Sequence, residues 1–276
     1  MRWIFAILLL LVMACSIDTV SSLDENIAAE TDDLWTENDV VRDTITDSRD
    51  GKKYEVVKIG NQWWMAENLD YVLDSSFCYN DELDSCEIYG RLYTWDVAMN
   101  LDRRYLTDNA FYYEQVDSVH QGICPDNWHI PTKSEWRKLI EFMEFHNGDE
   151  GSGASIRTPY GWVTGMGEWA DDYSHKVPVE SVNRFGFAAL PGGARATRSL
   201  TSCNCYSYED SRNNLFCGHA YFSFFWSATE DYSYRNNTNY AAFVTVNGMM
   251  NSGGVYIYDN PDKSKDWAMS VRCVKN

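Results

Sequence analysis

The stretch 124–136, with the sequence CPDNWHIPTKSEW, contains a complete helix start. Pro131 keeps the backbone ahead of Thr132 extended. Thr132 and Glu135 have the spacing of a capping box, in which each side chain satisfies an amide that the first helical turn leaves without a partner. The residues that follow recur at three- and four-residue intervals, as on a buried helical face: Trp136, Leu139, Ile140 and Met143. The pattern predicts a helix that runs to about Phe145.

Two further elements are predicted ahead of this helix. The segments 53–59 and 62–66 are alternating or apolar, and the turn signal Gly60-Asn61 between them predicts a β-hairpin. A short helix is predicted over 90–99, because its apolar residues share one helical face: Leu92, Trp95 and Met99.

The second half of the chain predicts strands between long loops. Six glycines between 146 and 183 disfavour a continuous helix or strand, so this region is predicted to be mostly loop. Asn247-Gly248 is a strong signal for a type I′ hairpin turn. Strands are predicted over 185–190, 222–229, 240–246 and 267–274. Two early helices, short later strands and long loops together indicate the α+β class.

The N-terminus has the pattern of an export signal that ends at a cysteine. Arg2 precedes an apolar run that is too short to span a bilayer but fits the core of a signal peptide. Residues 12–15, Val-Met-Ala-Cys, resemble the bacterial lipobox, and Ser16 after it is typical of outer-membrane delivery. We therefore expect a signal peptide over 1–14 and an exported outer-membrane lipoprotein, displayed at the cell surface and anchored through a lipidated Cys15. The alternative is an ordinary signal with an unrelated cysteine.

The segment after Cys15 is strongly acidic. Between residues 16 and 50, eleven carboxylates stand against two arginines, in a chain whose formal charge is −18. Such a segment is expected to be a flexible, self-repelling spacer, which we place at 15–46. The alternative is an acidic recognition segment. Nucleic acid is not an expected partner, because phosphate binding requires clustered Lys and Arg.

The remainder, 47–276, fits one large domain, and six ordered blocks in it carry a family resemblance. The blocks lie at 50–69 (DG…IG…QWWMAENL), 89–95 (YGRLYTW), 124–136, 189–193 (ALPGG), 225–230 (FWSATE) and 270–274 (SVRCV). Together they resemble the Fibrobacter succinogenes major paralogous domain. That family is known mostly from secreted or surface-anchored bacterial proteins and has no established molecular function.

A more distant resemblance implies a fold. The motif PTxxEW at 131–136 and the terminal Arg272-Cys273-Val274 are similar to the formylglycine-generating, sulfatase-modifying enzymes, which are variants of the C-type lectin fold. This resemblance implies a single C-type-lectin-like α+β domain. It would have neighbouring N- and C-terminal strands, two helices, short antiparallel strands and a loop-rich ligand face.

Seven cysteines remain after Cys15, in a compartment where disulfides form. Cys78 and Cys86 are close in sequence across a turn-rich loop and are expected to pair. Cys124 precedes the capped helix and Cys273 lies in the last predicted strand, which favours a second, long-range disulfide.

The other three cysteines share one long polar segment and allow three interpretations. We expect Cys217 to pair with Cys203 or Cys205, which leaves one thiol free. The alternative is a tetrahedral zinc site made by these three sulfurs and His219, although the spacing is not that of a standard zinc finger. The third interpretation is a copper- or thiol-dependent oxidase similar to the formylglycine-generating enzymes.

No other catalytic constellation stands out, so no enzyme activity and no resident cofactor are expected. The five histidines are scattered, and His129 is expected to be a structural hydrogen-bonding group rather than a base. Glu230 and Asp231 are carboxylates of the kind that calcium binds. However, the Glu-Pro-Asn and Trp-Asn-Asp signatures of calcium-dependent lectins are absent.

Tyrosines set among Asn, Ser and Gly indicate a binding surface. Tyrosine in this company supplies rigid contact area and adaptable hydrogen bonding, as in antibody loops, and its ring can stack on sugars. The candidate ligand-binding residues are Tyr206, Tyr208, Tyr232, Tyr234, Tyr256 and Tyr258. The sequence therefore favours non-enzymatic binding of polysaccharide or another cell-surface component. A structural surface protein without a small ligand is the alternative.

Overall fold

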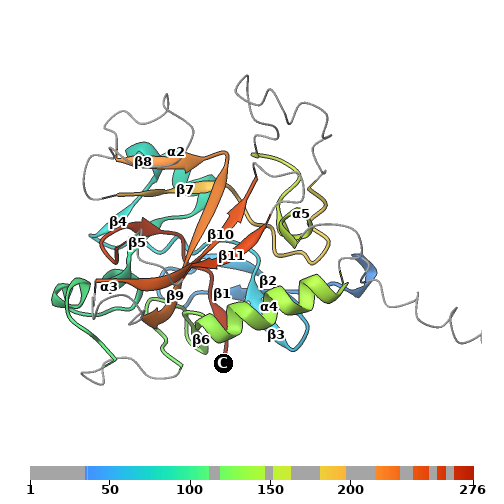
Figure 1. Cartoon of the computed structure of the whole chain (residues 1–276), viewed down its shortest axis with the longest axis horizontal. Coiled ribbons are helices and arrows are strands. Elements are labelled where there is room, and N and C mark those ends of the chain that lie inside the picture. Colours follow the sequence, from blue (N-terminus) through green and yellow to red (C-terminus); the bar gives the residue numbers. More distant parts are fainter. Residues whose placement is uncertain are drawn as a thin grey trace, which may run out of the picture. The chain divides into compact units, whose positions relative to one another are not determined.

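The computed structural model describes residues 35, 37–111, 119–146, 152–162, 181–196, 215–230, 239–248, 254–258 and 264–276. They belong to one unit, Trp35–Asn276 (Figure 1). The helices within these ranges are all too short or too polar to span a lipid bilayer.

Two β-sheets organise this unit. The five-stranded sheet has the order β1-β2-β3-β13-β6. Its strands are β1 (Val41–Thr46), β2 (Lys53–Ile59), β3 (Gln62–Met65), β6 (Trp128–His129) and β13 (Val274–Lys275). The eight-stranded sheet has the order β11-β10-β9-β7-β12-β5-β4, with β8 paired to β7. Its strands are β4 (Ser76–Phe77), β5 (Leu92–Thr94), β7 (Gly192–Arg195), β8 (Phe216–His219), β9 (Phe222–Glu230), β10 (Ala241–Asn247), β11 (Val255–Tyr258) and β12 (Ala268–Met269).

Four α-helices lie in the described ranges, where the sequence predicted two. They are α2 (Leu83–Tyr89), α3 (Trp95–Ala98), α4 (Lys133–His146) and α5 (Ser152–Ile156). Short 3-10 turns are η2 (Glu37–Asp39), η3 (Tyr79–Asp81) and η4 (Arg103–Leu106). Antiparallel pairs join most strands and β7 pairs parallel with β9, so the predicted α+β class is confirmed.

The helix start predicted at Thr132 is confirmed in atomic detail. Thr132 N–H donates to Glu135 Oε2 at 2.9 Å, and Glu135 N–H donates to Thr132 Oγ1 at 3.2 Å. This reciprocal pair is a capping box. The helix that follows, α4, buries the four predicted side chains: Trp136, Leu139, Ile140 and Met143.

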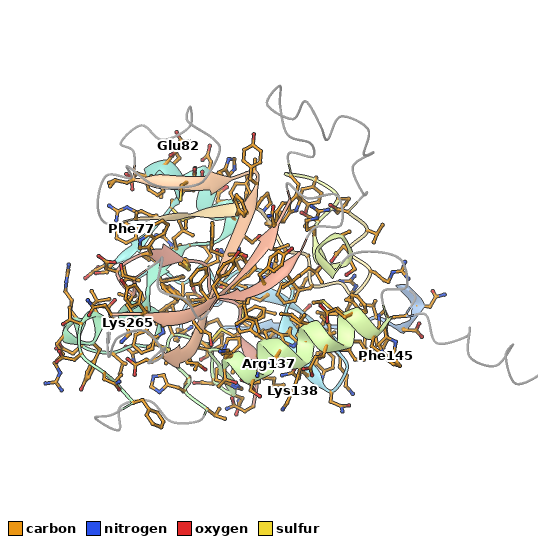
Figure 2. All side chains as sticks on the ribbon, viewed as in Figure 1. Phe77, Glu82, Arg137, Lys138, Phe145 and Lys265 are labelled. Carbon is orange, nitrogen blue, oxygen red and sulfur yellow. A yellow bond between two sulfur atoms is a disulfide. The ribbon has the colours of Figure 1, made fainter. Side chains whose placement is uncertain are left out.

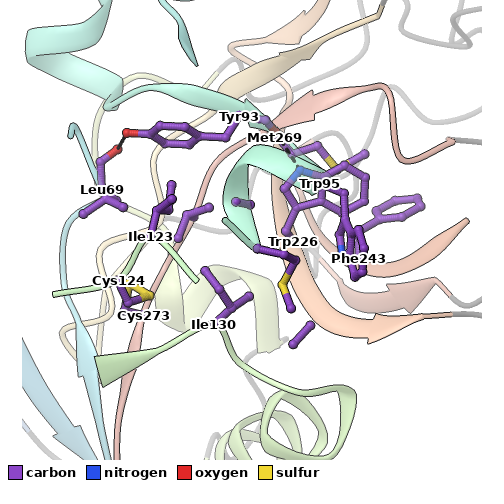
Figure 3. Packing of buried hydrophobic residues seen from close by; sticks show 14 of the residues in the cluster. Leu69, Tyr93, Trp95, Ile123, Cys124, Ile130, Trp226, Phe243, Met269 and Cys273 are labelled. Carbon is purple, nitrogen blue, oxygen red and sulfur yellow. Dashed lines mark hydrogen bonds between the residues drawn. A yellow bond between two sulfur atoms is a disulfide. The ribbon is translucent and has the colours of Figure 1, made fainter. Parts of the chain in front are cut away.

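The two faces of β9 and β10 contribute to different hydrophobic clusters. The first cluster also contains the β5–α3 segment with Trp95 (Figure 3). The indole of Trp95 donates to Ser227 O at 3.0 Å. In return, Trp226 Nε1 donates to the carbonyl oxygen of Tyr93 at 2.8 Å. The second cluster lies under α4, where Trp136 packs on Trp64 of β3 with ring centroids 4.7 Å apart. Because successive strand residues point to opposite faces, these central strands serve both clusters.

The predicted C-terminal strand is divided between the two sheets. The sequence predicted one strand over 267–274, whereas β12 pairs with β5 and β7, and β13 pairs with β3 and β6. Every side chain from 268 to 274 is buried. A continuous apolar run therefore indicated burial correctly but could not show that the chain changes sheets. The pairing of β13 with β3 places the C-terminal strand in the same sheet as the N-terminal hairpin β2–β3.

Part of the segment predicted as an acidic spacer, 15–46, belongs to the folded unit. Val41–Thr46 form β1, which pairs antiparallel with β2. Trp35 packs edge-on against Phe142 of α4, with ring centroids 5.2 Å apart. Most side chains of β1 are exposed, so its polar sequence resembles a spacer although its backbone belongs to the sheet. The folded unit therefore begins before residue 47.

Four further predictions are corrected by the structure. The helix predicted over 90–99 is a strand, β5, followed by the short α3. Residues 185–190 are buried irregular backbone, and the strand β7 begins after them at Gly192. Helix α5 lies inside the region predicted to be loop. The hairpin β10–β11 is present, but its connection spans 248–254 instead of a two-residue turn.

Candidate binding surface

Two of the six predicted binding tyrosines lie in the described ranges, and β11 places them on one face. Tyr256 and Tyr258 alternate with Val255 and Ile257 along the strand, and they are 41% and 39% exposed. Their rings are 6.4 Å apart between centroids, at an interplanar angle of 63°. Tyr206, Tyr208, Tyr232 and Tyr234 lie outside the described residues.

The core supports this tyrosine pair. Tyr258 lies opposite Phe243 of β10 and stacks on its ring at 5.2 Å, with the planes 6° apart. Phe243 is itself buried in the first cluster. Strand β11 ends the eight-stranded sheet, and within the described ranges no strand pairs with its outer edge. The two rings are therefore presented by a rigid strand at the border of the sheet.

Both predicted disulfides, one short-range and one long-range, are confirmed. Cys78 and Cys86 are bonded, with Cα atoms 5.0 Å apart. They join the start of η3 to α2. The sequence predicted a turn-rich loop between the two cysteines, whereas α2 begins there at Leu83. Cys124 and Cys273 are bonded at a Cα separation of 5.9 Å, next to the first cluster (Figure 3).

Cys217 is also disulfide-bonded. The other described cysteines are already paired, so its partner lies outside the described residues, where Cys203 and Cys205 are. A disulfide sulfur is not a thiolate ligand. The predicted zinc site with His219 would therefore require Cys217 to be reduced, and it stays a prediction. Within the described ranges, no three His, Cys, Asp or Glu side chains are grouped as metal ligands.

Glu230 does not have the role that the sequence suggested for it as a calcium ligand. Its carboxylate is buried and forms an ion pair with the buried ammonium of Lys265. It also accepts the N–H groups of Ala110 at 3.1 Å and Phe111 at 2.8 Å. Lys265 lies over the ring of Trp95 at 4.4 Å, and its burial lowers the pKa of its ammonium, against the opposing effect of Glu230. Asp231 lies outside the described residues.

His129 has the structural surroundings that the sequence predicted. Its Nε2 lies 2.9 Å from Glu135 Oε1 and its Nδ1 lies 2.6 Å from Asn276 Oδ1. Burial disfavours the charged ring, but the hydrogen bond and the charge of Glu135 outweigh it and raise the pKa of His129. The pKa of Glu135 is lowered, since the bonds from His129 and Thr132 outweigh the effect of burial. An imidazolium with both nitrogens donating fits these contacts.

Arg272 was quoted for the family resemblance, but its burial was not predicted. Its guanidinium is fully buried and donates to Asn68 Oδ1 at 2.6 Å and to Ala188 O at 2.8 Å. It also donates to the carbonyl oxygens of Met65 and Phe187. No carboxylate in the described ranges forms an ion pair with it, and burial lowers the pKa of this guanidinium to about 9. The only sequence signal for this role is an arginine inside an apolar run.

Comparison with known proteins identifies the family. The model of the Fibrobacter succinogenes major domain matches residues 57–275. The chain belongs to this family. No match was found among curated proteins or among solved structures. The matched range covers both described disulfides, the tyrosine pair of β11 and both sheets except β1 and the first part of β2, so the family match spans most of the folded unit.

Proposed function

We propose that this member of the Fibrobacter succinogenes major domain family is a lipid-anchored surface protein that binds polysaccharide without transforming it. The observation that carries the proposal is the pair Tyr256 and Tyr258, exposed side by side on a strand whose other face is core. An exposed aromatic pair offers flat apolar area with a hydroxyl at each tip, which suits the alternating C–H and O–H surface of a sugar chain.

The rigidity of β11 supports the binding role. Tyr258 stacks on the buried Phe243, and the strand forms four backbone pairs with β10. Side chains held in this way lose little conformational entropy when a ligand arrives, so more of the contact energy appears as affinity. The two rings keep 41% and 39% of their surface exposed, which leaves area for contact with a ligand.

The anchor and the finer fold belong to the same proposal. A lipidated Cys15 after a signal peptide at 1–14 would tether the domain through an acidic spacer to the outer membrane. The α+β architecture, with β13 next to β3, supports the C-type-lectin-like fold that the distant resemblance implies. A non-enzymatic domain of this kind needs no catalytic residue and no resident cofactor.

Retention on insoluble polysaccharide tests the proposal. The full chain, purified in detergent, is mixed with cellulose and with xylan, and the protein left in solution is measured, with and without EDTA. We expect saturable retention that weakens about tenfold in the double variant Tyr256→Ala/Tyr258→Ala, the loss expected from two aromatic contacts. Phe145→Ala is the matched control, because Phe145 is an exposed aromatic on α4 (Figure 2).

The outcomes separate the competing functions. Retention that is equal in the double variant and in wild type would remove the tyrosine pair from the site. No retention on any polysaccharide would move the proposal to a structural surface protein. Retention abolished by EDTA would instead indicate calcium, which the tyrosine contact does not require.

A further inference from the structure

A polar groove of about 460 Å³ lies on a different part of the protein. Its walls come from β2, the segment 66–70 after β3, the C-terminal part of α2 with Gly90, and the segments 158–160 and 188–190. No residue of β11 lines it. A concave site of this size is in the range that holds small ligands or a peptide side chain.

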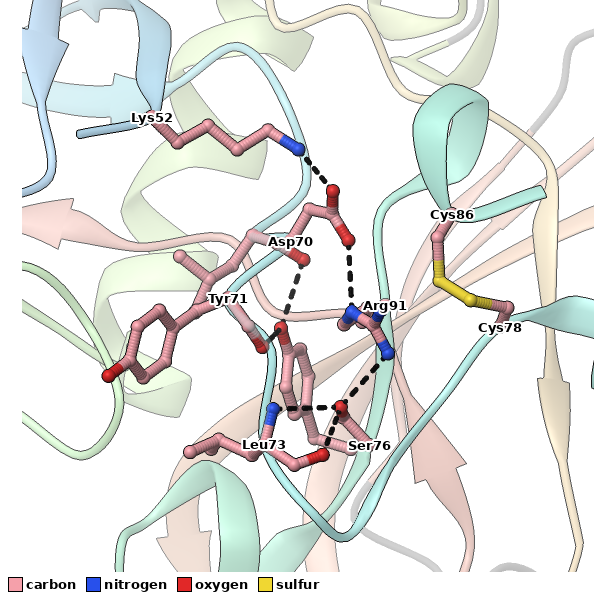
Figure 4. The surroundings of a disulfide bond; sticks show 10 residues. Lys52, Asp70, Tyr71, Leu73, Ser76, Cys78, Cys86 and Arg91 are labelled. Atoms are coloured by element: carbon pink, nitrogen blue, oxygen red, sulfur yellow. Dashed lines mark hydrogen bonds and ion pairs between the residues drawn. A yellow bond between two sulfur atoms is a disulfide. The ribbon is translucent and has the colours of Figure 1, made fainter. Parts of the chain in front are cut away.

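Negative charge dominates the groove. Four carboxylates and one ammonium line it: Glu55, Glu67, Asp70, Glu87 and Lys52. Lys52 pairs with Asp70, whose second oxygen lies 3.3 Å from Arg91 Nε, so Asp70 is neutralised within the protein (Figure 4). No ion pair in the described ranges involves the three glutamates. Glu67 Oε2 accepts only the backbone N–H of Glu55, at 2.8 Å.

The buried guanidinium of Arg272 does not supply the missing cation. It donates to Asn68 Oδ1 and to the backbone carbonyls of Met65 and Ala188, and it forms no hydrogen bond with a carboxylate of the groove. Glu67 interacts electrostatically with Arg272, but within the described ranges none of the three glutamates forms an ion pair, so the groove keeps an excess of negative charge. A cleft lined by one sign of charge raises the local concentration of ligands of the opposite sign.

The rim adds apolar and aromatic surface to this charge. Ile88 and Tyr160 both line the groove and are 56% and 65% exposed. An aliphatic side chain suits the methylene stem of a lysine, and a tyrosine ring attracts an ammonium through its π face. Exposed apolar residues beside a polar cleft are typical of contact sites.

The walls are held in place before any ligand arrives. Gly90 ends α2 with φ at +71°, and an added Cβ there would lie 2.7 Å from Asn68 Cβ. Helix α2 thus packs its end directly on the segment 66–70. The Cys78–Cys86 disulfide links the same helix to the segment before η3, and Cys86 itself lines the groove (Figure 4). A preformed groove avoids part of the ordering cost of binding.

We propose that this groove binds a protonated amine on an aliphatic stem, the chemistry of a lysine side chain. The ammonium lies among Glu55, Glu67 and Glu87, and the stem lies against Ile88 and Tyr160. Anionic ligands are excluded by the same charges. The two sources of this chemistry are a lysine displayed by a partner protein and a free diamine.

Calorimetric titration of the full chain tests the proposal. The probes are Nα-acetyl-lysine amide, cadaverine and Nα-acetyl-norleucine amide, whose stem has no charge. We expect saturable binding of the two cations, weaker at high salt because the charges are screened, and none of norleucine amide. A stronger response to the lysine amide points to a protein partner, and a stronger response to cadaverine points to a free diamine.

Charge-neutral variants locate the site. Glu67→Gln and Glu87→Gln should each weaken binding of the lysine amide about two- to fivefold, the range of a solvent-accessible ion pair. Glu144→Gln on the exposed face of α4 removes the same charge elsewhere and should change nothing. Equal binding of norleucine amide, or unchanged affinity in both groove variants, overturns the proposal, and the salt dependence tests it without any variant.

The result is separable from that of the polysaccharide experiment. Tyr256→Ala/Tyr258→Ala should leave lysine-amide binding intact, and the groove variants should leave polysaccharide retention intact. If a soluble glucan competes with the lysine amide and binding does not respond to salt, the groove is a sugar site and the cation assignment is wrong.

Discussion

Two arginines and one lysine are buried in the described part of the chain, each with a different set of partners. Arg272 donates to an amide oxygen and backbone carbonyls, Lys265 pairs with Glu230, and Arg157 lies 5.4 Å from the ring of Trp162. Lys265 also joins distant parts of the chain, because its Nζ donates to the carbonyls of Tyr105 and Asp108. Buried charges persist only where such partners replace water.

Removing Lys265 should destabilise the protein, because it leaves the buried carboxylate of Glu230 without its cation. Lys265→Met leaves the Glu230 carboxylate without its cation, and we expect a loss of about 3–5 kcal/mol in the free energy of unfolding. Glu230→Gln in the same chain should restore part of this loss. Lys138→Met on the outer face of α4 (Figure 2) is the control and should cost less than about 0.5 kcal/mol. Urea denaturation measures all four proteins, and similar losses for the two lysines would contradict the expectation.

The pair of His129 and Glu135 should make stability depend on pH in a defined window. The folded-state pKa of His129 is raised above 6.5, so its contribution is complete below pH 6.5 and is lost as pH rises through the folded value. The pKa of Glu135 is lowered below 4.5, so its contribution is complete above pH 4.5 and is lost as pH falls through the folded value. The pair therefore contributes most between pH 4.5 and 6.5.

Substitution of His129 by glutamine tests this window. The difference in unfolding free energy between wild type and His129→Gln should be larger at about pH 5.5 than at about pH 8.5. Urea denaturation at the two pH values gives this difference directly. A difference that stays constant would mean that the ring is not charged in the folded protein.

At the level of single elements, the sequence predicted correctly those structures that depend on one short stretch of the chain. The capping box of α4 and the β2–β3 hairpin depend on neighbouring residues, and both were predicted correctly. Strand β1 and the change of sheet after β12 depend on partners far along the chain, and both were missed. The groove escaped prediction for the same reason, since its walls come from distant segments.

The capping box of α4 should have a measurable share in stability. Thr132→Ala removes the oxygen that accepts Glu135 N–H and the hydroxyl that donates to Glu135 Oε2 at 2.8 Å. We expect a loss of about 1 kcal/mol in thermal or urea denaturation. Ser134→Ala changes an exposed residue in the first turn of the same helix. Its free energy of unfolding should stay within about 0.5 kcal/mol of that of the wild type. A larger effect at Ser134 than at Thr132 would refute the assignment.

For the whole molecule, the two described disulfides should stabilise to different degrees. Cys124–Cys273 closes a loop with a sequence separation of 149, and Cys78–Cys86 one with a separation of 8. Loop-closure entropy predicts losses of about 5 and about 2.5 kcal/mol when each pair is replaced by alanine. Urea denaturation of the two double variants without reductant compares them. Equal losses would show that strain or residual structure outweighs loop length.

The position of β12 and β13 at the end of the domain affects when the domain can fold during its synthesis. Ribosomes synthesise these residues after all other parts of the described domain, yet they supply pairing partners to both sheets. Until they emerge, β3 lacks β13 and β5 lacks β12. This domain is therefore expected to remain open during synthesis until β13 has left the ribosome, because neither sheet is complete before then.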